Sequence, residues 1–227
     1  DHSDYRVDPW GRLQRTADFL AATTYGPIAQ AEAAIERVGR VHAHVTGVAE
    51  KAGDFLAALG YSEHDAELAR IAGFLHDIGN VINRTDHAQS GAVMAFRILD
   101  QMGMDPEDIA TVISAIGNHD ESTACPVSPI AAALILADKS DVRRTRVRNC
   151  DAMSFDIHDR VNYAVTQAKS YLSDDKKEFV LKLHIDRDIS SVMDYFEIFL
   201  TRMLLCRRAA ESLGLEFKLI INGQVLL

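Results

Sequence analysis

The chain has 227 residues, 48% of them apolar and 25% charged, with a formal net charge of −9. This composition is ordinary for a folded globular protein and excludes a wholly disordered chain. The negative charge argues against a general nucleic-acid-binding surface, because phosphate backbones are held mainly by lysine and arginine. A local basic patch could still bind a small anion.

No apolar run approaches the roughly eighteen residues of a membrane span. The first fifteen residues lack the basic start and apolar stretch of a secretory signal. We therefore expect a cytoplasmic protein with no membrane partner. Three widely spaced cysteines, Cys125, Cys150 and Cys206, predict neither a disulfide framework nor a zinc knuckle.

From about residue 27 to residue 140 the sequence predicts a succession of helices, because apolar residues recur at spacings of three and four. One apolar stripe runs from Val45 to Leu59. Ser62 and Asp65 then open a second helix as a capping box, and its stripe runs to Gly79.

Three further helix starts follow. One lies near Asp86, and its helix ends at Gly103. The other two are Asp105-Pro106 and Ser128-Pro129, each an N-cap followed by proline at the first helical position. Five helices in about a hundred residues predict a compact bundle.

The pattern changes after Asn149. Residues 160–172 and 178–186 favour strands around a polar turn, and residues 191–213 predict a long amphipathic helix. Residues 216–227 alternate and contain Asn222-Gly223, a hairpin-turn dipeptide. We therefore predict a mostly α protein, with a helical domain over residues 1–150 and a small α+β (β-β-α-β) appendage over residues 151–227. The 191–213 helix is a candidate surface for a homodimer.

His76-Asp77 lies at the C-terminal end of an apolar helix. Burying this pair is costly unless a metal or hydrogen bonds satisfy it. Successive helical residues project about 100° apart, so the pair can approach one ion from two sides or two neighbouring ions. Imidazole with carboxylate suits Mn, Fe, Zn or Ni better than calcium. Taken alone, the pair is more simply a helix-end histidine oriented by its neighbour.

Other histidines and an aspartate lie on the neighbouring helices of the predicted bundle. His44 lies on the preceding helix, His87 begins the following one and His119 ends the fourth. Asp138 lies in an apolar run of the fifth helix, where a carboxylate is rarely buried without a partner. His42 competes with His44 for the first position.

In these residues the sequence resembles the HD superfamily of metal-dependent phosphohydrolases, over about residues 40–141. The family pattern is a histidine, a His-Asp pair, further histidines and a distant aspartate. Residues 76–79 spell its HDIG motif, and residues 137–141 resemble its closing aspartate segment. The spacing is most similar to HD domains of the RNase Y type and, more loosely, to HD-GYP domains.

The resemblance implies an HD-domain helical bundle with a dinuclear metal site for one or two divalent ions (Mn, Fe, Mg, Ni or Zn). It implies hydrolysis of a phosphate monoester or diester by a metal-activated water, with a nucleotide, cyclic nucleotide or short oligonucleotide as substrate. Asp77 is the implied bridging carboxylate and catalytic residue. The implied ligands are His44, His76, Asp77 and Asp138 for the first ion, and His87 and His119 for the second.

The candidate substrate-binding residues are Asn80, Arg143 and Arg144. Asn80 stands where relatives commonly have a lysine that can contact phosphate. Arg143 and Arg144 begin a basic run that is either a phosphate-binding rim or a solvated connector. The Gly-Tyr-Pro phrase of HD-GYP enzymes is absent, so cyclic-di-GMP is not an expected substrate.

Two alternatives to the phosphohydrolase stay open. Some HD-fold proteins use the same ligand set as di-iron oxygenases. The chain could also be a non-catalytic metal-binding sensor or scaffold.

Overall fold

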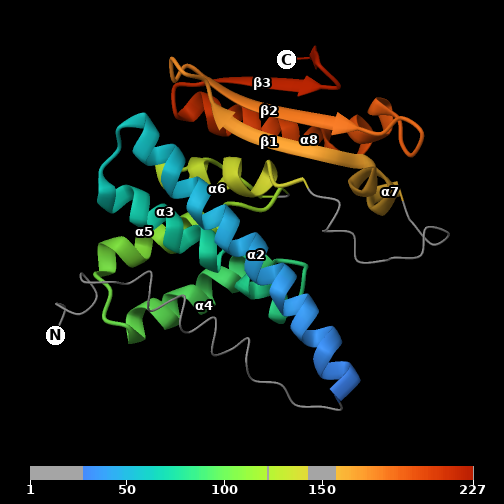
Figure 1. The fold of residues 1–227 in the computed structure, drawn as a ribbon. Helices are drawn as coiled ribbons and strands as arrows, with labels where there is room; N and C mark the ends of the chain where they lie inside the picture. Colours follow the sequence, from blue (N-terminus) through green and yellow to red (C-terminus); the bar gives the residue numbers. More distant parts are fainter. Residues whose placement is uncertain (1–27, 122, 143–156, 227) are drawn as a thin grey trace.

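The computed structural model describes residues 28–121, 123–142 and 157–226 (Figure 1). Its first part is a group of helices: α2 (Ile28–Leu59), α3 (Glu63–Leu75), the short 3-10 helix η1 (Ile78–Val81), α4 (His87–Gln101), α5 (Pro106–Gly117) and α6 (Pro129–Lys139). Its second part contains α7 (Ile157–Ala164), β1 (Val165–Leu172), β2 (Glu178–Ile185), α8 (Val192–Ser212), β3 (Glu216–Ile221) and β4 (Gln224–Val225). This mostly helical fold with a small C-terminal sheet confirms the predicted fold class.

The capping residues begin three helices where the sequence places them. Ser62 and Asp65 form a reciprocal capping box at the start of α3. The side chain of Asp105 accepts a hydrogen bond from the first turn of α5, and that of Ser128 accepts one from the first turn of α6. Each cap satisfies a backbone N–H that the helix leaves unpaired, a contribution of about 1 kcal/mol.

The second predicted helix is shorter than its apolar stripe suggests. It ends at Leu75 rather than at Gly79, and η1 follows. A Cβ atom on Gly79 would overlap the carbonyl oxygen of His87 and lie 2.6 Å from the backbone nitrogen of Gly91. The chain leaves the α-helix here so that its backbone can lie directly against α4.

Helix α6 occupies the centre of the molecule and contacts α2, α3, α5 and α8. All of its residues from Ile130 to Lys139 are buried. A helix that is apolar on nearly all sides is normally buried. The burial of Asp138 therefore follows from the place of its helix in the core.

The C-terminal sheet has the order β1-β2-β3-β4. Strands β1 and β2 are antiparallel, whereas β2 and β3 are parallel because α8 carries the chain back across the sheet. Asn222 and Gly223, with φ of 50° and 83°, turn the chain from β3 into β4. This arrangement contains the predicted β-β-α-β order, with the helix α7 added before it and the short strand β4 after it.

One predicted strand was too long. Residues 160–164 belong to α7 rather than to a strand, and β1 begins at Val165. Val161 and Ala164 are both fully buried, three positions apart, which is the spacing of a helix face. The predicted domain boundary near residue 150 lies outside the described residues and stays a prediction.

The two faces of the sheet differ. The inner face packs against α8 through buried side chains such as Phe179, Leu181 and Phe217. Towards the bundle, the Ser170 hydroxyl accepts a hydrogen bond from Lys51 at 3.1 Å and contacts the Ser140 hydroxyl at 3.0 Å.

Among the described helices, none combines the length and hydrophobicity needed to cross a bilayer.

Candidate metal centre

Six side chains, from helices and from the residues that follow them, converge on one place inside the bundle. They form three overlapping groups in which all potential ligand atoms lie within 4.8 Å of one another. These are the six residues for which the family resemblance implied a metal-binding role. They are His44 in α2, His76 and Asp77 between α3 and η1, His87 at the start of α4, His119 just after α5, and Asp138 in the last turn of α6.

Three of the histidine rings are oriented by backbone carbonyl groups. A carbonyl oxygen can only accept a hydrogen bond, so the Nδ1 atom of each ring carries the proton and the Nε2 atom presents a lone pair. A metal-binding histidine usually shows this arrangement. The Nδ1 atoms of His76, His87 and His119 lie 2.7, 2.9 and 2.6 Å from the carbonyl oxygens of Gly73, Arg84 and Ile116.

The fourth ring, that of His44, is oriented by a carboxylate. Its Nδ1 atom lies 2.6 Å from Asp141 Oδ2, and both side chains are buried. Its Nε2 atom points to the cluster and lies 3.4 Å from Asp138 Oδ1. Asp141 therefore sets the orientation of His44, a role that the sequence analysis did not assign to it.

We expect Asp141→Ala to weaken metal binding about 10–100-fold, the usual effect of losing a group that orients a ligand. Asp141→Asn should keep much of the affinity, because its amide oxygen still accepts a hydrogen bond from the imidazole. Titration of each chelator-treated variant with manganese would measure the difference. Equal affinities for wild type and Asp141→Ala would contradict the assignment.

The two oxygens of Asp77 face different histidines. Oδ2 lies 3.7 Å from His76 Nε2 and 3.9 Å from His44 Nε2, whereas Oδ1 lies 3.4 Å from His87 Nε2. Two donors on one zinc-sized ion lie about 3.3 Å apart, because each bond is about 2.0–2.1 Å long. The two oxygens of the Asp77 carboxylate are therefore directed at different histidines of the cluster.

The Nε2 atoms of His76 and His119 have no hydrogen-bond partner, and both residues are 0% exposed. A buried polar atom without a partner is costly, and native structures seldom keep one without a reason. A divalent cation would satisfy both lone pairs, so the donor set fits such an ion.

The electrostatics of the cluster favour the ligand forms of these groups. Burial, the neighbouring His76 ring and the Lys139 ammonium lower the pKa of His119 to about 3, so its imidazole is neutral. Burial alone would raise the pKa of Asp138, but Lys139 and the rings of His44 and His76 hold that pKa well below its usual value. His119 is therefore a neutral imidazole and Asp138 an ionised carboxylate, the forms that bind a cation.

Asp77 is also kept in its ionised form. Burial and the nearby Asp138 would raise its pKa, but the rings of His76, His119 and His44 bring that pKa below its usual value. In addition, α3, α5 and α6 all end at the cluster. The C-terminal end of a helix carries partial negative charge, which favours a cation there.

The structure adds neighbours that sequence reasoning missed. The Lys139 ammonium lies 2.6 Å from Asp138 Oδ2, and both side chains are buried. From α8, the Arg202 guanidinium lies 2.7 Å from Glu121 Oε1, two residues beyond His119. No sequence spacing indicates this contact, because the two residues are 81 positions apart.

The predicted substrate-binding residues and the alternative ligand His42 are not part of the cluster of six residues. Asn80 lies in η1, where its backbone N–H donates to the Asp77 carbonyl at 3.0 Å. Arg143 and Arg144 lie outside the described residues. His42 belongs to none of the three groups, and its ring packs edge-on against Phe74.

Gly79 has no Cβ atom, so the chain just after His76 and Asp77 can lie directly against the start of α4, where His87 is. A substitution of Gly79 therefore tests this close contact. We expect Gly79→Ala to displace His87, to destabilise the protein by about 1–3 kcal/mol through overpacking, and to lower the bound metal per chain. Urea denaturation and metal analysis would measure both effects. Gly117→Ala is the control, because its Cβ would make only an ordinary 3.7 Å contact with Ala92. Wild-type stability and metal content in Gly79→Ala would contradict this role.

Two family models match the chain. The HD domain model matches residues 41–160, which is 120 of the 227 residues and includes all six cluster residues. The model described as ER-bound oxygenase mpaB/B′/rubber oxygenase, catalytic domain, matches residues 1–75, which include only His44 of the cluster. No curated protein sequence matches the chain.

Proposed function

The chain belongs to the HD domain family, whose members are generally hydrolases, and from this membership we propose that it is a metal-dependent phosphohydrolase. The proposed substrate is a phosphate monoester or diester of a nucleotide, cyclic nucleotide or short oligonucleotide. The observation that supports the proposal most strongly is the set of four imidazoles whose Nδ1 atoms are all engaged. Their Nε2 atoms surround the carboxylates of Asp77 and Asp138.

We assign the six residues to two ion positions. His44, His76 and Asp138 would hold the first ion, His87 and His119 would hold the second, and Asp77 would be a ligand to both. When bound, divalent ions supply positive charge that stabilises the transferring phosphoryl group, and they lower the pKa of a coordinated water. HD domains bind divalent metals. We propose that the ion bound here is Mn, Fe, Mg, Ni or Zn.

The protein contributes orientation to this chemistry. The carbonyl groups and Asp141 hold each imidazole in one tautomer, so the ligands need no rearrangement before an ion binds. The ionised Asp77 lies between the two groups of histidines and is 20% exposed, so it is the acidic ligand that solvent and substrate can reach. Asn80, Arg143 and Arg144 are proposed to contact the substrate phosphate.

Metal analysis of freshly purified protein, followed by a product screen, tests the function. We expect one or two divalent ions per chain and phosphate or nucleotide release with added manganese. The substrates screened are mono-, di- and cyclic nucleotides and short oligonucleotides. Stoichiometric metal without hydrolysis of any of them would contradict the proposal and favour a sensor or scaffold.

The match to an oxygenase catalytic domain favours a second candidate, an oxygenase that uses iron at the same cluster. It ranks below hydrolysis because the matched residues end at residue 75, before His76 and Asp77. Bound iron with substrate-dependent oxygen consumption would favour the oxygenase. Hydrolysis with manganese and no oxygen uptake would favour the hydrolase.

A homodimer through α8 also remains a proposal. Most apolar residues of α8 are buried within the chain, but Met193, Leu200 and Leu204 are exposed along one side of the helix. We expect sedimentation equilibrium to show a dimer that Leu200→Glu dissociates. A strictly monomeric wild-type protein would contradict this proposal.

A further inference from the structure

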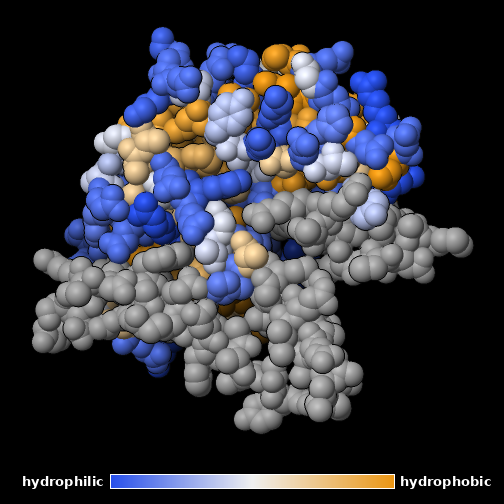
Figure 2. All heavy atoms as spheres, viewed as in Figure 1, coloured by the Kyte–Doolittle hydropathy of each residue, from blue (hydrophilic) through white to orange (hydrophobic). Residues whose placement is uncertain are grey.

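Two lysines face each other on the outer face of the sheet, in a chain of net charge −9. Lys169 on β1 and Lys182 on β2 are direct partners in the antiparallel register, so their side chains project from the same face. Both are exposed, on the side opposite the apolar residues that pack against α8. In Figure 2, blue hydrophilic residues and orange hydrophobic residues are interspersed over the upper part of the molecule, where the sheet lies.

This lysine pair is unfavourable in the free protein. Like charges directly opposite each other on neighbouring strands are destabilising. A third lysine on the same face shows the usual solution, because the ammonium of Lys218 lies 2.7 Å from Glu178 Oε1. Among the described residues, no carboxylate forms a comparable ion pair with Lys169 or Lys182.

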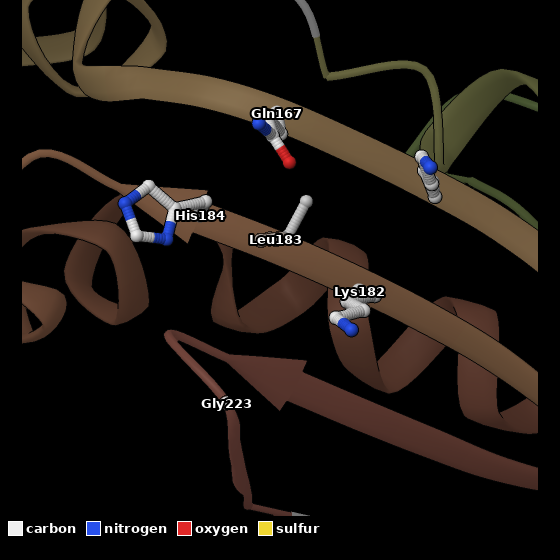
Figure 3. A pocket seen from close by; sticks show the side chains of 6 residues that line it. Gln167, Lys182, Leu183, His184 and Gly223 are labelled. Carbon is white, nitrogen blue, oxygen red and sulfur yellow. The ribbon is translucent and has the colours of Figure 1, made fainter.

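A pocket lies beside the pair. Its cavity of about 120 Å³ is lined by Gln167, Lys169, Lys182, Leu183, His184 and Gly223. Figure 3 shows Gln167, His184 and Lys182 on neighbouring strands around this pocket, with Gly223 at the turn beside it. The lining contains two ammonium groups, a side-chain amide and an imidazole as possible donors, and no carboxylate.

A second cavity adjoins the first and shares His184 with it. Its volume is about 390 Å³, and it is a shallow, open hollow. Its lining includes Thr166, Asp186 and Asn222, which offer both donors and acceptors. The first cavity is the smaller of the two, which suits one phosphate group rather than a whole ligand.

We propose that this face of the sheet binds a small phosphomonoester, with its phosphate between Lys169 and Lys182 and its polar organic part in the cavity beyond His184. The phosphate would neutralise the two facing ammonium groups, and the adjoining hydroxyl, amide and carboxylate groups suit a polyhydroxylated organic part. The site faces away from the bundle that carries the metal centre, and the proposal does not depend on the hydrolase assignment.

Nuclear magnetic resonance of the full chain, with a chelator present, tests the site residue by residue. Orthophosphate and adenosine monophosphate are titrated separately while the amide signals of Gly223 and Gln167 are followed. We expect saturable shifts with both and tighter binding of the monophosphate. Lys169→Gln and Lys182→Gln should each weaken binding at least about tenfold, the expected effect of losing one charge-assisted contact.

Lys218→Gln is the matched control, because it removes an equal charge from the same face and should leave the affinity unchanged. Lys182→Gln should also raise the melting temperature by roughly 1–3 °C in phosphate-free buffer of low salt, because it removes the repulsion. Equal loss of affinity in Lys218→Gln would overturn the proposal, since it would indicate general charge attraction. Shifts caused by a single-stranded oligonucleotide but not by either phosphate would overturn it in favour of a polymer.

Discussion

Replacing Asp77 with alanine is expected to remove bound metal and phosphate ester hydrolysis together while the protein stays folded. The carboxylate lies 3.4–3.9 Å from the Nε2 atoms of three histidines, so its loss opens both proposed ion positions. Losing metal catalysis of several kcal/mol would lower kcat/KM at least about a thousandfold. Metal analysis, steady-state kinetics and circular dichroism of the same preparation would measure the three quantities.

The fold should survive because the side chain of Asp77 is partly exposed and lies outside the apolar core. His76→Ala should behave similarly with respect to metal. His64→Ala is its matched control, because His64 is an exposed histidine that contacts Asp108 instead of the cluster. Full metal content in both Asp77→Ala and His76→Ala would refute the site assignment.

Replacing Asp138 with alanine is expected to remove metal and also to destabilise the fold. The reason is Lys139, whose buried ammonium lies 2.6 Å from the Asp138 carboxylate. Removing one partner of a buried ion pair leaves the other charge uncompensated, which typically costs about 3–5 kcal/mol. Urea denaturation of chelator-treated Asp138→Ala should therefore show a clearly lower midpoint than that of wild type treated in the same way.

A second substitution separates the two effects. In Asp138→Ala/Lys139→Met the buried charge is gone, so most of the lost stability should return while metal binding stays absent. Lys139→Met alone should keep the metal ligand and bind metal. If the double variant is no more stable than Asp138→Ala, the ion pair is not the cause of the loss.

Much of the metal centre could be predicted from the sequence, because the types of its residues and their order along the chain indicate metal ligands. A His-Asp pair after an apolar helix, a histidine within the preceding helix, two further histidines near helix ends and one aspartate in an apolar run are costly to bury unless something satisfies them. Capping residues such as Ser62 and Ser128 act within one turn, so they predict helix starts reliably. The approximate order of helices and strands follows from the same short-range patterns.

Contacts between distant segments were decided by the tertiary structure alone. Asp141 orients His44 across 97 positions, and Arg202 reaches Glu121 across 81, and no local pattern encodes either contact. The end of α3 depends on how closely Gly79 lies against α4, and the facing lysines on β1 and β2 depend on strand register. Local propensities act over a few residues, whereas these features require the packing of the whole chain, because only packing brings such groups within bonding distance.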